Sequence, residues 1–213
     1  RSWGTVDKVV TVPNGVNVDM FAQESDTVYD APDIAFVGSM NYFPNEQAAR
    51  FLYDAIRPHI ERQRPETTIG IIGVNPKKEL LEFESNHFHI HGPVPRIAPY
   101  YHHSGLLAVP LLSGSGTRLK ILEAAACGTP IVTTSLGCEG IDLIHGRHCL
   151  IENDPRKFAE ACVSLLENPS IARTMGMEAQ QLMREKYDWS IAANTMNNAV
   201  QAILPVRTKE VAS

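Results

Sequence analysis

The stretch SGSGTRLKILEAAACGTPIV, residues 113–132, combines a glycine-rich turn, a predicted helix and the start of an apolar strand. The small residues at 113–117 lead into two cations, Arg118 and Lys120. The amides and the dipole at such a helix start attract anions. Glu123 lies one turn further along and carries the opposite charge. The stretch therefore predicts a ligand that presents both an anionic group and hydrogen-bond donors.

The segments on either side of this stretch repeat the order strand, glycine turn and helix. We predict strands at 34–39, 67–76, 87–94, 105–112, 129–135 and 148–153. Between them we predict helices at 44–63, 77–83 and 117–128, and short helices or helical turns at 96–104 and 139–147. The strands are apolar throughout instead of alternating, which is typical of parallel strands covered on both faces. The predicted fold class is α/β, a doubly wound, Rossmann-like parallel sheet of about six strands.

The two ends of the chain do not follow this rhythm. Residues 8–21 are interpreted as a strand closed by an Asn-Gly turn, and 22–33 as a polar connector. Three closing helices are predicted at 154–168, 169–187 and 189–204. We therefore divide the chain into the end of a preceding domain plus a linker (1–30), a ligand-binding domain (31–205) and a tail (206–213). The sequence does not begin with methionine, so we expect the carboxyl-terminal piece of a longer protein.

Composition excludes several classes of function. The 213 residues carry a formal net charge of -5, which argues against a nucleic-acid binder. No apolar run approaches the roughly 20 residues of a membrane-spanning helix. The glycine-rich turn is not followed by Lys-Ser or Lys-Thr, so it is not a P-loop. None of the four cysteines forms a Cys-x-x-Cys pair, and we expect buried thiols in a reducing compartment.

The residue types of the opening stretch fit a nucleoside diphosphate. Thr117 is placed to act as an N-cap or as a phosphate-contacting hydroxyl, and Arg118 and Lys120 supply positive charge. The carboxylate of Glu123 can accept two hydrogen bonds from a vicinal diol, as in the ribose sites of dinucleotide folds. Two alternatives stay open: the turn is a flexible surface loop, or Glu123 is an exposed helix residue paired with Lys120.

The segment GTRLKILEAAACGTPIVTTSLGCEGI, residues 116–141, closely resembles the nucleotide-sugar-binding segment of GT-B glycosyltransferases, specifically glycosyltransferase family 4 (group 1). VVTVPNGVNVDMF is similar to the end of that family's amino-terminal domain, FVGSMNYFPN to its first carboxyl-domain strand and REKYDWS to the lead into its closing helix. The resemblance runs from about residue 9 to residue 200. It identifies the chain as a carboxyl-terminal donor-binding domain.

The resemblance implies transfer of a sugar from a nucleoside diphosphate sugar to an acceptor, with retention of configuration and with no metal or other cofactor. It implies that Glu123 binds the ribose hydroxyls and that Gly38 and Ser39 approach the diphosphate. The loop that includes Ser115, Gly116 and Thr117 would cradle the phosphates and the sugar. The loops carrying Val74, Gly92 and Val94 would frame the base.

Further expectations follow from the same resemblance. The amino-terminal, acceptor-binding domain is absent from this chain, so we expect nucleotide binding without sugar transfer by this fragment. The full-length enzyme is expected in the cytoplasm, in polysaccharide or glycoconjugate synthesis, with peripheral membrane association through the absent domain. Two rivals remain: a nucleotide-sugar epimerase of the same fold, and a non-catalytic flavodoxin-like binding module.

The sequence departs from the family pattern at two places. Ser115 occupies a position where the family has a second glutamate, eight residues before the ribose-binding one. The family's Arg and Lys after the first strand are not evident in GSMNYFPNEQAAR, and we hypothesise that Arg118 and Lys120 supply that charge. These departures leave the orientation of the donor sugar and the catalytic residues unassigned.

Histidines form the other conspicuous cluster. His87, His89 and His91 alternate along one predicted strand, and His102 and His103 follow closely. Strand positions two apart are too widely spread for three imidazoles to meet one zinc ion, so we predict no metal site. Histidines at an edge strand or near the nucleotide base are the preferred interpretation.

Overall fold

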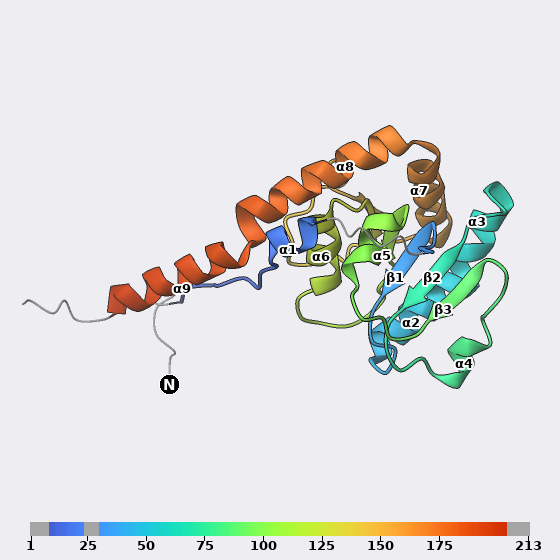
Figure 1. Cartoon of the computed structure of the whole chain (residues 1–213), viewed down its shortest axis with the longest axis horizontal. Helices are drawn as coiled ribbons and strands as arrows, with labels where there is room; N and C mark the ends of the chain where they lie inside the picture. Colours follow the sequence, from blue (N-terminus) through green and yellow to red (C-terminus); the bar gives the residue numbers. More distant parts are fainter. Residues whose placement is uncertain (1–8, 24–29, 204–213) are drawn as a thin grey trace, which may run out of the picture.

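The computed structural model describes residues 9–23 and 30–203 and forms one six-stranded parallel sheet (Figure 1). The strand order is β3-β2-β1-β4-β5-β6, as predicted for a doubly wound sheet. Ile34 of β1 pairs with Ile69 of β2 on one side and with Leu106 of β4 on the other. The strands are β1 Ile34–Val37, β2 Ile69–Ile72, β3 Phe88–His91, β4 Leu106–Val109, β5 Ile131–Thr133 and β6 Leu150–Ile151.

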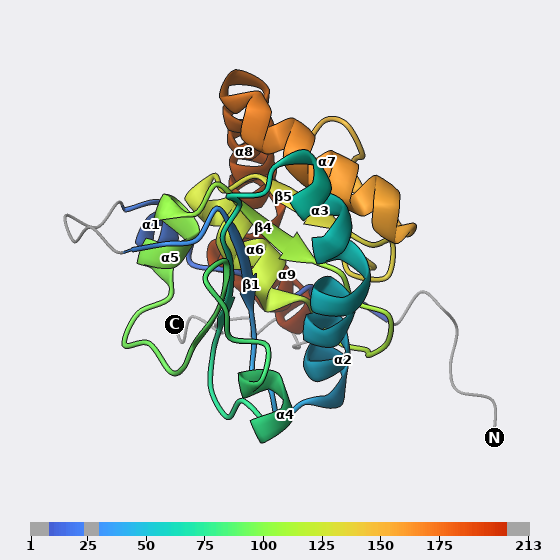
Figure 2. The ribbon, with the colours of Figure 1, turned by 90° about the vertical axis from the view of Figure 1, so that its right-hand side faces the viewer.

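Helices cover both faces of this sheet, which is why its central strands are apolar throughout. Figure 2 shows the layers: α2 (Phe43–Phe51) and α3 (Arg57–Gln63) lie on one side, and α1 (Val18–Ala22) and α5 (Ala98–His103) on the other. The first layer is completed by α7 (Pro155–Glu167) and the second by α6 (Leu119–Cys127), with α8 (Pro169–Leu182) packed against α6. The short α4 (Lys78–Leu81) lies beside α2.

The helix predicted at 44–63 is a single path with a π-helical turn in it, η2 (Leu52–Ile56), between α2 and α3. Pro58 accounts for this interruption because it has no N–H for the carbonyl of Asp54, four residues earlier, and its ring crowds that carbonyl. A second π-helical turn, η3 (Met183–Tyr187), ends the helix predicted at 169–187. Both helices keep their predicted places in the fold.

Two sequence predictions about elements are wrong. Residues 9–15 form no strand; Val16 makes only an isolated parallel bridge with Asp188, and the short helix α1 follows. Asn17 starts this helix by accepting the amide of Met20 at 2.9 Å, an N-cap signal that the strand prediction overlooked. Residues 139–147 form turns without a helix. Predictions that concern residues 1–8, 24–29 and 206–213 lie outside the described residues.

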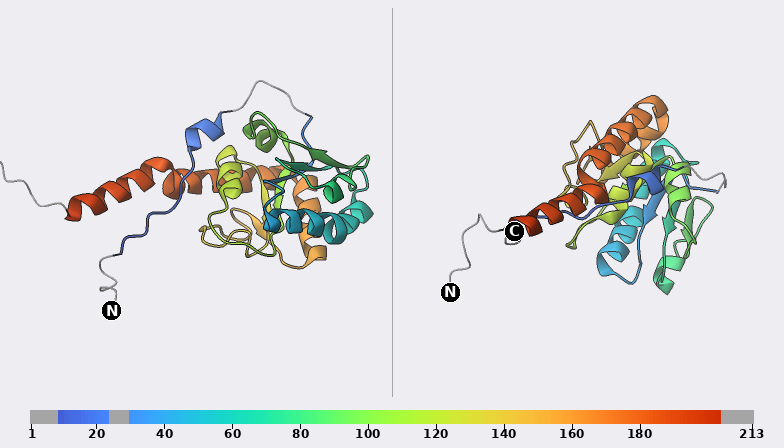
Figure 3. Two further views of the ribbon diagram at one scale, coloured as in Figure 1. Left: turned by 90° about the horizontal axis from the view of Figure 1, so that it is seen from below. Right: turned by 60° about the vertical axis from the view of Figure 1, so that its left-hand side comes forward.

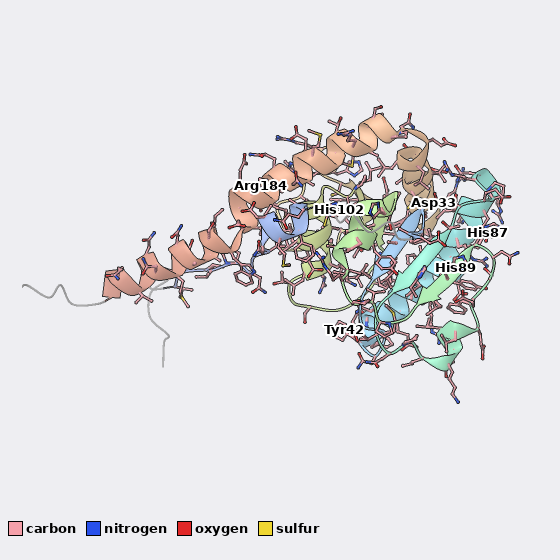
Figure 4. All side chains as sticks on the ribbon, in the orientation of Figure 1. Asp33, Tyr42, His87, His89, His102 and Arg184 are labelled. Carbon is pink, nitrogen blue, oxygen red and sulfur yellow. The ribbon has the colours of Figure 1, made fainter. Side chains whose placement is uncertain are left out.

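The chain on either side of the sheet domain is joined at one place. The amide of Val16 donates to the carbonyl of Tyr187 at 2.8 Å, and Arg184 forms an ion pair with Asp19 of α1 at 2.9 Å (Figure 4). From there α9 (Trp189–Ile203) extends away from the sheet, and the stretch that leads into α1 leaves on the same side of the molecule (Figure 3). Within the described residues, no helix combines the length and the hydropathy needed to cross a membrane.

The parallel strands bring their following loops to one edge of the sheet. In Figure 4, Asp33 precedes β1 at one edge and Tyr42 follows it at the other. The loops after β1, β2, β3 and β4 all leave from the edge marked by Tyr42, which is where ligands bind in open α/β sheets. All four cysteines are free thiols, and Cys138, Cys149 and Cys162 are buried.

Candidate functional site

A cleft of about 300 Å³ opens at this edge between the loop after β1, the start of α2 and the loop leading into α6. Its lining includes Gly38, Asn45, Ser115, Arg118, Lys120 and Glu123. The structure thus brings the stretch that begins at residue 113 together with the glycine turn at Gly38, 75 or more residues earlier in the chain. Of the residues predicted to bind the donor, Ser39 and Gly116 are not part of the lining.

The loop before α6 is shaped by Arg118. Its guanidinium donates to the carbonyls of Ser115 (2.8 Å), Gly116 (3.1 Å) and Gly114 (3.0 Å), and the residue is only 6% exposed. Gly114 and Gly116 have positive φ values of 111° and 86°, which lets the chain wrap around this side chain. Arg118 therefore organises the loop before α6, whereas the sequence-based interpretation assigned its charge to the ligand.

The start of α6 also differs from the sequence-based interpretation. Arg118, and not Thr117, occupies the N-cap position; the hydroxyl of Thr117 instead accepts a 2.6 Å hydrogen bond from Asn14. The amides of Leu119 and Ile121 donate to the carbonyls of Thr117 (3.1 Å) and Arg118 (2.8 Å). Because these two amides already donate within the chain, they are not free to bind an anion.

We expect Arg118→Lys to lower the free energy of unfolding by about 2 kcal/mol, because an ammonium cannot span three carbonyls as the planar guanidinium does. Urea denaturation measures this change. Arg156→Lys is the matched control, since Arg156 forms an exposed i,i+4 pair with Glu160 and should change stability by less than about 0.5 kcal/mol. Equal stability of the two variants would contradict a structural role for Arg118.

Lys120 is the cation at the floor of the cleft. Its Nζ donates to Asn45 Oδ1 at 2.7 Å and lies 4.4 Å from the ring centre of Phe36, the buried aromatic of β1. Burial, reinforced by the charge of Arg118, lowers the pKa of Lys120 to about 7, while Glu123 acts in the opposite direction. The amine is therefore poised between its charged and neutral forms at neutral pH.

Glu123 lies half-buried one turn further along α6. Its Oε2 accepts a 3.0 Å hydrogen bond from the hydroxyl of Tyr101, which belongs to α5 and is buried. Burial raises the pKa of Glu123, and both the Tyr101 hydroxyl and the charge of Lys120 oppose that rise. No ion pair between Glu123 and Lys120 is formed in the described structure, so the alternative of a paired surface glutamate is not what the fold builds. Within the described residues, Glu123 Oε1 accepts no hydrogen bond from the protein.

The loops predicted to frame the base are drawn together behind the cleft. The amide of Gly38 donates to Ile72 (3.0 Å), and that of Met40 to Val74 (2.9 Å). A Cβ on Gly73 would overlap the carbonyl oxygen of Gly38, so the loop after β1 and the loop after β2 are in direct backbone contact. A 3.3 Å bond from Gly73 to Gly92 adds the third loop.

Individual residues of these loops differ in exposure. Val74 is exposed, whereas Gly92 and Val94 are half-buried and Val94 packs against the core. Ser39 donates from its hydroxyl to Asn41 at 2.6 Å. These positions lie at the correct edge of the sheet, and their roles toward a base or a diphosphate stay predictions.

Sequence reasoning missed two residues that hold the cleft together. Asn45 was recognised only as part of a helix start, and Tyr101 only as part of a short helix. Each contacts a candidate binding residue from another element, at 2.7 Å for Asn45 and Lys120 and at 3.0 Å for Tyr101 and Glu123. The available signal was the type of these side chains, the amide of Asn45 and the phenol of Tyr101, close to the edge where the predicted loops meet.

The histidine cluster lies elsewhere. His89 and His91 belong to the edge strand β3, with ring centres 6.1 Å apart, and His89 faces Glu84 at 3.0 Å (Figure 4). The second oxygen of Glu84 accepts the amide of Ile90 at 2.8 Å and so covers part of the open edge of the sheet. In the described part of the chain, no group of three or more His, Cys, Asp or Glu side chains is arranged to hold a metal ion.

Comparisons with known proteins connect this fold to a family. An uncharacterized 44.6 kDa protein in the cps region of Klebsiella pneumoniae is 26% identical over 165 residues, 73% of this chain and 42% of that protein. Glycogen synthase of Mycobacterium tuberculosis is 25% identical over 199 residues, 87% of this chain and 46% of that protein. The chain spans about half the length of the curated relatives it matches.

Solved structures and a family model agree with these relatives. The structure of Anabaena HepE in complex with UDP and glucose has a TM-score of 0.74 at 14% identity, over 90% of this chain and 56% of HepE. This likeness confirms the Rossmann-like fold. The family model for group 1 glycosyl transferases matches residues 31–168. The chain therefore belongs to the glycosyl transferases group 1 family.

Proposed function

We propose that this chain is the nucleotide-sugar donor domain of a retaining glycosyltransferase. The observation that carries the proposal is one cleft lined by both the amine of Lys120, whose pKa burial lowers to about 7, and the half-buried carboxylate of Glu123, one helical turn further along α6. A diphosphate suits the amine and a ribose diol suits the carboxylate, and both groups occur in one nucleoside diphosphate sugar. HepE, which has the same fold, was crystallised in complex with UDP and glucose.

The residues of the cleft would act by electrostatics and positioning. When the bond between the sugar and the diphosphate breaks, negative charge grows on the departing phosphate oxygens. Lys120 is placed to stabilise that charge, and the loop held by Arg118 would keep the diphosphate fixed against it. The acceptor would be held by the remainder of the full-length protein, so we propose that this chain alone binds donor without transferring sugar. Its cytoplasmic setting and a polysaccharide or glycoconjugate product are part of the same proposal.

A thermal-shift screen tests donor binding. We expect one of UDP-glucose, GDP-mannose or ADP-glucose to raise the melting temperature, because a ligand at 100 times its Kd adds about 2.7 kcal/mol of stability. Inorganic phosphate and free glucose at the same concentrations are controls and should give smaller shifts. If no nucleotide sugar or nucleoside diphosphate shifts the melting temperature more than these controls, the proposed function is wrong.

A nucleotide-sugar epimerase of the same fold is the alternative that retains the same cleft. It would convert or hydrolyse its nucleotide sugar in the absence of any acceptor. Incubating the chain with the sugar nucleotide that binds, followed by chromatography of the products, separates the two functions. An unchanged nucleotide sugar supports a donor domain, and rapid epimerisation supports the alternative.

A further inference from the structure

Lys120 is a half-buried residue for whose amine the described structure provides no counterion. The only hydrogen bond that its Nζ donates is to the neutral amide of Asn45, and a neutral ring, that of Phe36, lies 4.4 Å away. None of the described ion pairs includes it. Buried charges in proteins are normally paired, because desolvation makes an unpaired one costly. This amine therefore lacks a partner that an anion in the open cleft would supply.

Asn45 fixes the position of this amine. It is 8% exposed, in the first turn of α2, and its two amide atoms make opposite contacts. Oδ1 accepts from Lys120, while Nδ2 donates to the carbonyl of Ser39 at 3.0 Å. The assignment of oxygen and nitrogen follows from these partners, since an ammonium can only donate and a carbonyl can only accept. Asn45 thus ties α6 to the loop after β1.

Gly38 leaves just enough room for this arrangement. A Cβ at Gly38 would lie 2.6 Å from Asn45 Nδ2 and 3.0 Å from Lys120 Nζ. The loop backbone, the amide and the amine are therefore in close contact on the floor of the cleft.

The charges around Lys120 come from a small number of elements. On α6 itself, Arg118 disfavours and Glu123 favours the charged amine. On α2, the nearest carboxylate in sequence to Asn45 is Glu46, which is already paired with Lys77 and Arg50. β1 contributes the neutral ring of Phe36, and α5 contributes Tyr101, whose hydroxyl is bonded to Glu123. Within these elements, no carboxylate neutralises Lys120 directly.

We propose that Asn45 is a positioning residue that holds the amine of Lys120 at the phosphate site, and that donor binding is accompanied by uptake of one proton at this amine. The proton comes from solvent and the new partner is a phosphate oxygen. This inference rests on the proposed donor site. It adds to that site a residue from α2 and a dependence of donor affinity on pH.

The sign of the dependence follows from the state of the free protein. The pKa of Lys120 is about 7, so the amine is half protonated at pH 7 and mostly neutral at pH 8.5. A phosphate in contact returns the pKa toward that of an ordinary lysine, about 10.4, so the bound amine is charged throughout this range. Affinity should therefore fall as pH rises, roughly fifteenfold between pH 7 and 8.5.

Titration calorimetry of the wild-type chain measures the proton directly. The probe is UDP-glucose, or GDP-mannose or ADP-glucose if one of those binds instead; their phosphates do not titrate between pH 7 and 8.5. Comparing the heat at pH 8 in HEPES and in Tris, which differ in ionisation enthalpy, gives the number of protons taken up. We expect about 0.9 proton per donor bound at pH 8, as follows from the pKa of about 7.

Three variants separate the proton from the position. Lys120→Met should bind more weakly, by tenfold or more at pH 7, with no uptake and no slope from pH 7 to 8.5. Asn45→Asp gives the amine a permanent counterion, so uptake should fall toward zero while Lys120 stays in place. Asn45→Leu removes both hydrogen bonds and should weaken binding at every pH. Lys157→Met, an exposed lysine of α7, is the matched control and should behave as wild type.

The outcomes are distinct. If a nucleotide sugar binds with an uptake near zero and a flat pH profile, the proton inference is overturned while the donor site stands. If Asn45→Leu binds as tightly as wild type, the positioning role is overturned. If none of the three nucleotide sugars binds, the proposed function fails and this inference falls with it. Melting temperatures of all variants show whether a loss of binding reflects a loss of folding.

Discussion

Replacing Gly176 with alanine is expected to lower the melting temperature by about 6 to 12 °C, a larger loss of stability than that expected for Arg118→Lys. Gly176 lies on α8, where the carbonyl of Gly128, at the end of α6, packs directly against it. A Cβ at this position would overlap that carbonyl oxygen. Because the Cβ is attached rigidly to the backbone of α8 and the carbonyl is itself backbone, neither can move aside without separating the two helices.

The size of the effect follows from competing contributions. Alanine is favoured over glycine inside a helix by about 1 kcal/mol, which would stabilise α8. Overpacking typically costs about 1–3 kcal/mol, and a clash of an added Cβ with a backbone carbonyl lies at or above the upper end of that range. Separation of the helices would also break the 2.8 Å hydrogen bond from Gln180 to the carbonyl of Ala126. We therefore expect a net loss of about 3 kcal/mol, or 6 to 12 °C for a chain of this size.

Differential scanning calorimetry measures this loss. Met177→Ala is the control on the same helix, because Met177 is 61% exposed and should change stability by less than about 0.5 kcal/mol. A melting temperature for Gly176→Ala within 2 °C of wild type would show that α6 and α8 separate easily. Since α6 carries Lys120 and Glu123, the variant should also bind nucleotide sugar more weakly.

The sheet could be predicted because its strands have a simple physical signature. Apolar β-branched runs such as 69–72, which end in glycine turns and alternate with amphipathic segments, admit few arrangements other than a covered parallel sheet. Local signals were weaker at the chain start, where Val9, Val10 and Val12 suggested a strand. No neighbouring strand pairs with that stretch in the described structure, and the cap at Asn17 favours the helix α1.

The candidate site was predicted in part, for a related reason. The loop and Glu123 are contiguous in sequence, so their proximity could be inferred from helical spacing alone. The contact between Asn45 and Lys120 spans 75 residues, and only the folded sheet brings them together. Arg118 could not be distinguished from Lys120 by charge or position. Arg118 holds the loop because backbone carbonyls of that loop surround its guanidinium. Lys120 lies on the cleft floor because its amine meets the side-chain carbonyl of Asn45.

Glu123→Ala is expected to weaken nucleotide-sugar binding about a hundredfold, the largest effect on binding after loss of the fold. The ribose contact that we propose consists of two hydrogen bonds to a charged acceptor, each contributing about 1.5–3 kcal/mol. At the lower end of that range the two bonds together contribute about 3 kcal/mol, and a loss of about 2.7 kcal/mol already corresponds to a hundredfold change in Kd. Titration calorimetry at pH 7 measures it, and Glu167→Ala, at an exposed position ending α7, should bind within twofold of wild type.

Tyr101→Phe tests whether the orientation of the carboxylate matters as well as its charge. The phenol donates to Glu123 at 3.0 Å, so its removal frees the carboxylate to rotate and further raises the pKa of Glu123. We expect about a tenfold loss of affinity in Tyr101→Phe and almost no further loss when it is combined with Glu123→Ala. Additive losses would mean that the two residues act independently.

Lys120 and Glu123 give the affinity opposite dependences on pH. Burial raises the pKa of Glu123 above its ordinary value, and a bound diol favours the ionised form, so binding should weaken as the solution is acidified through that pKa. Lys120 weakens binding as pH rises above 7. Wild-type affinity should therefore be greatest near neutral pH. Glu123→Gln should remove the acid limb alone and Lys120→Met the alkaline limb alone, because each limb follows the protonation of one side chain.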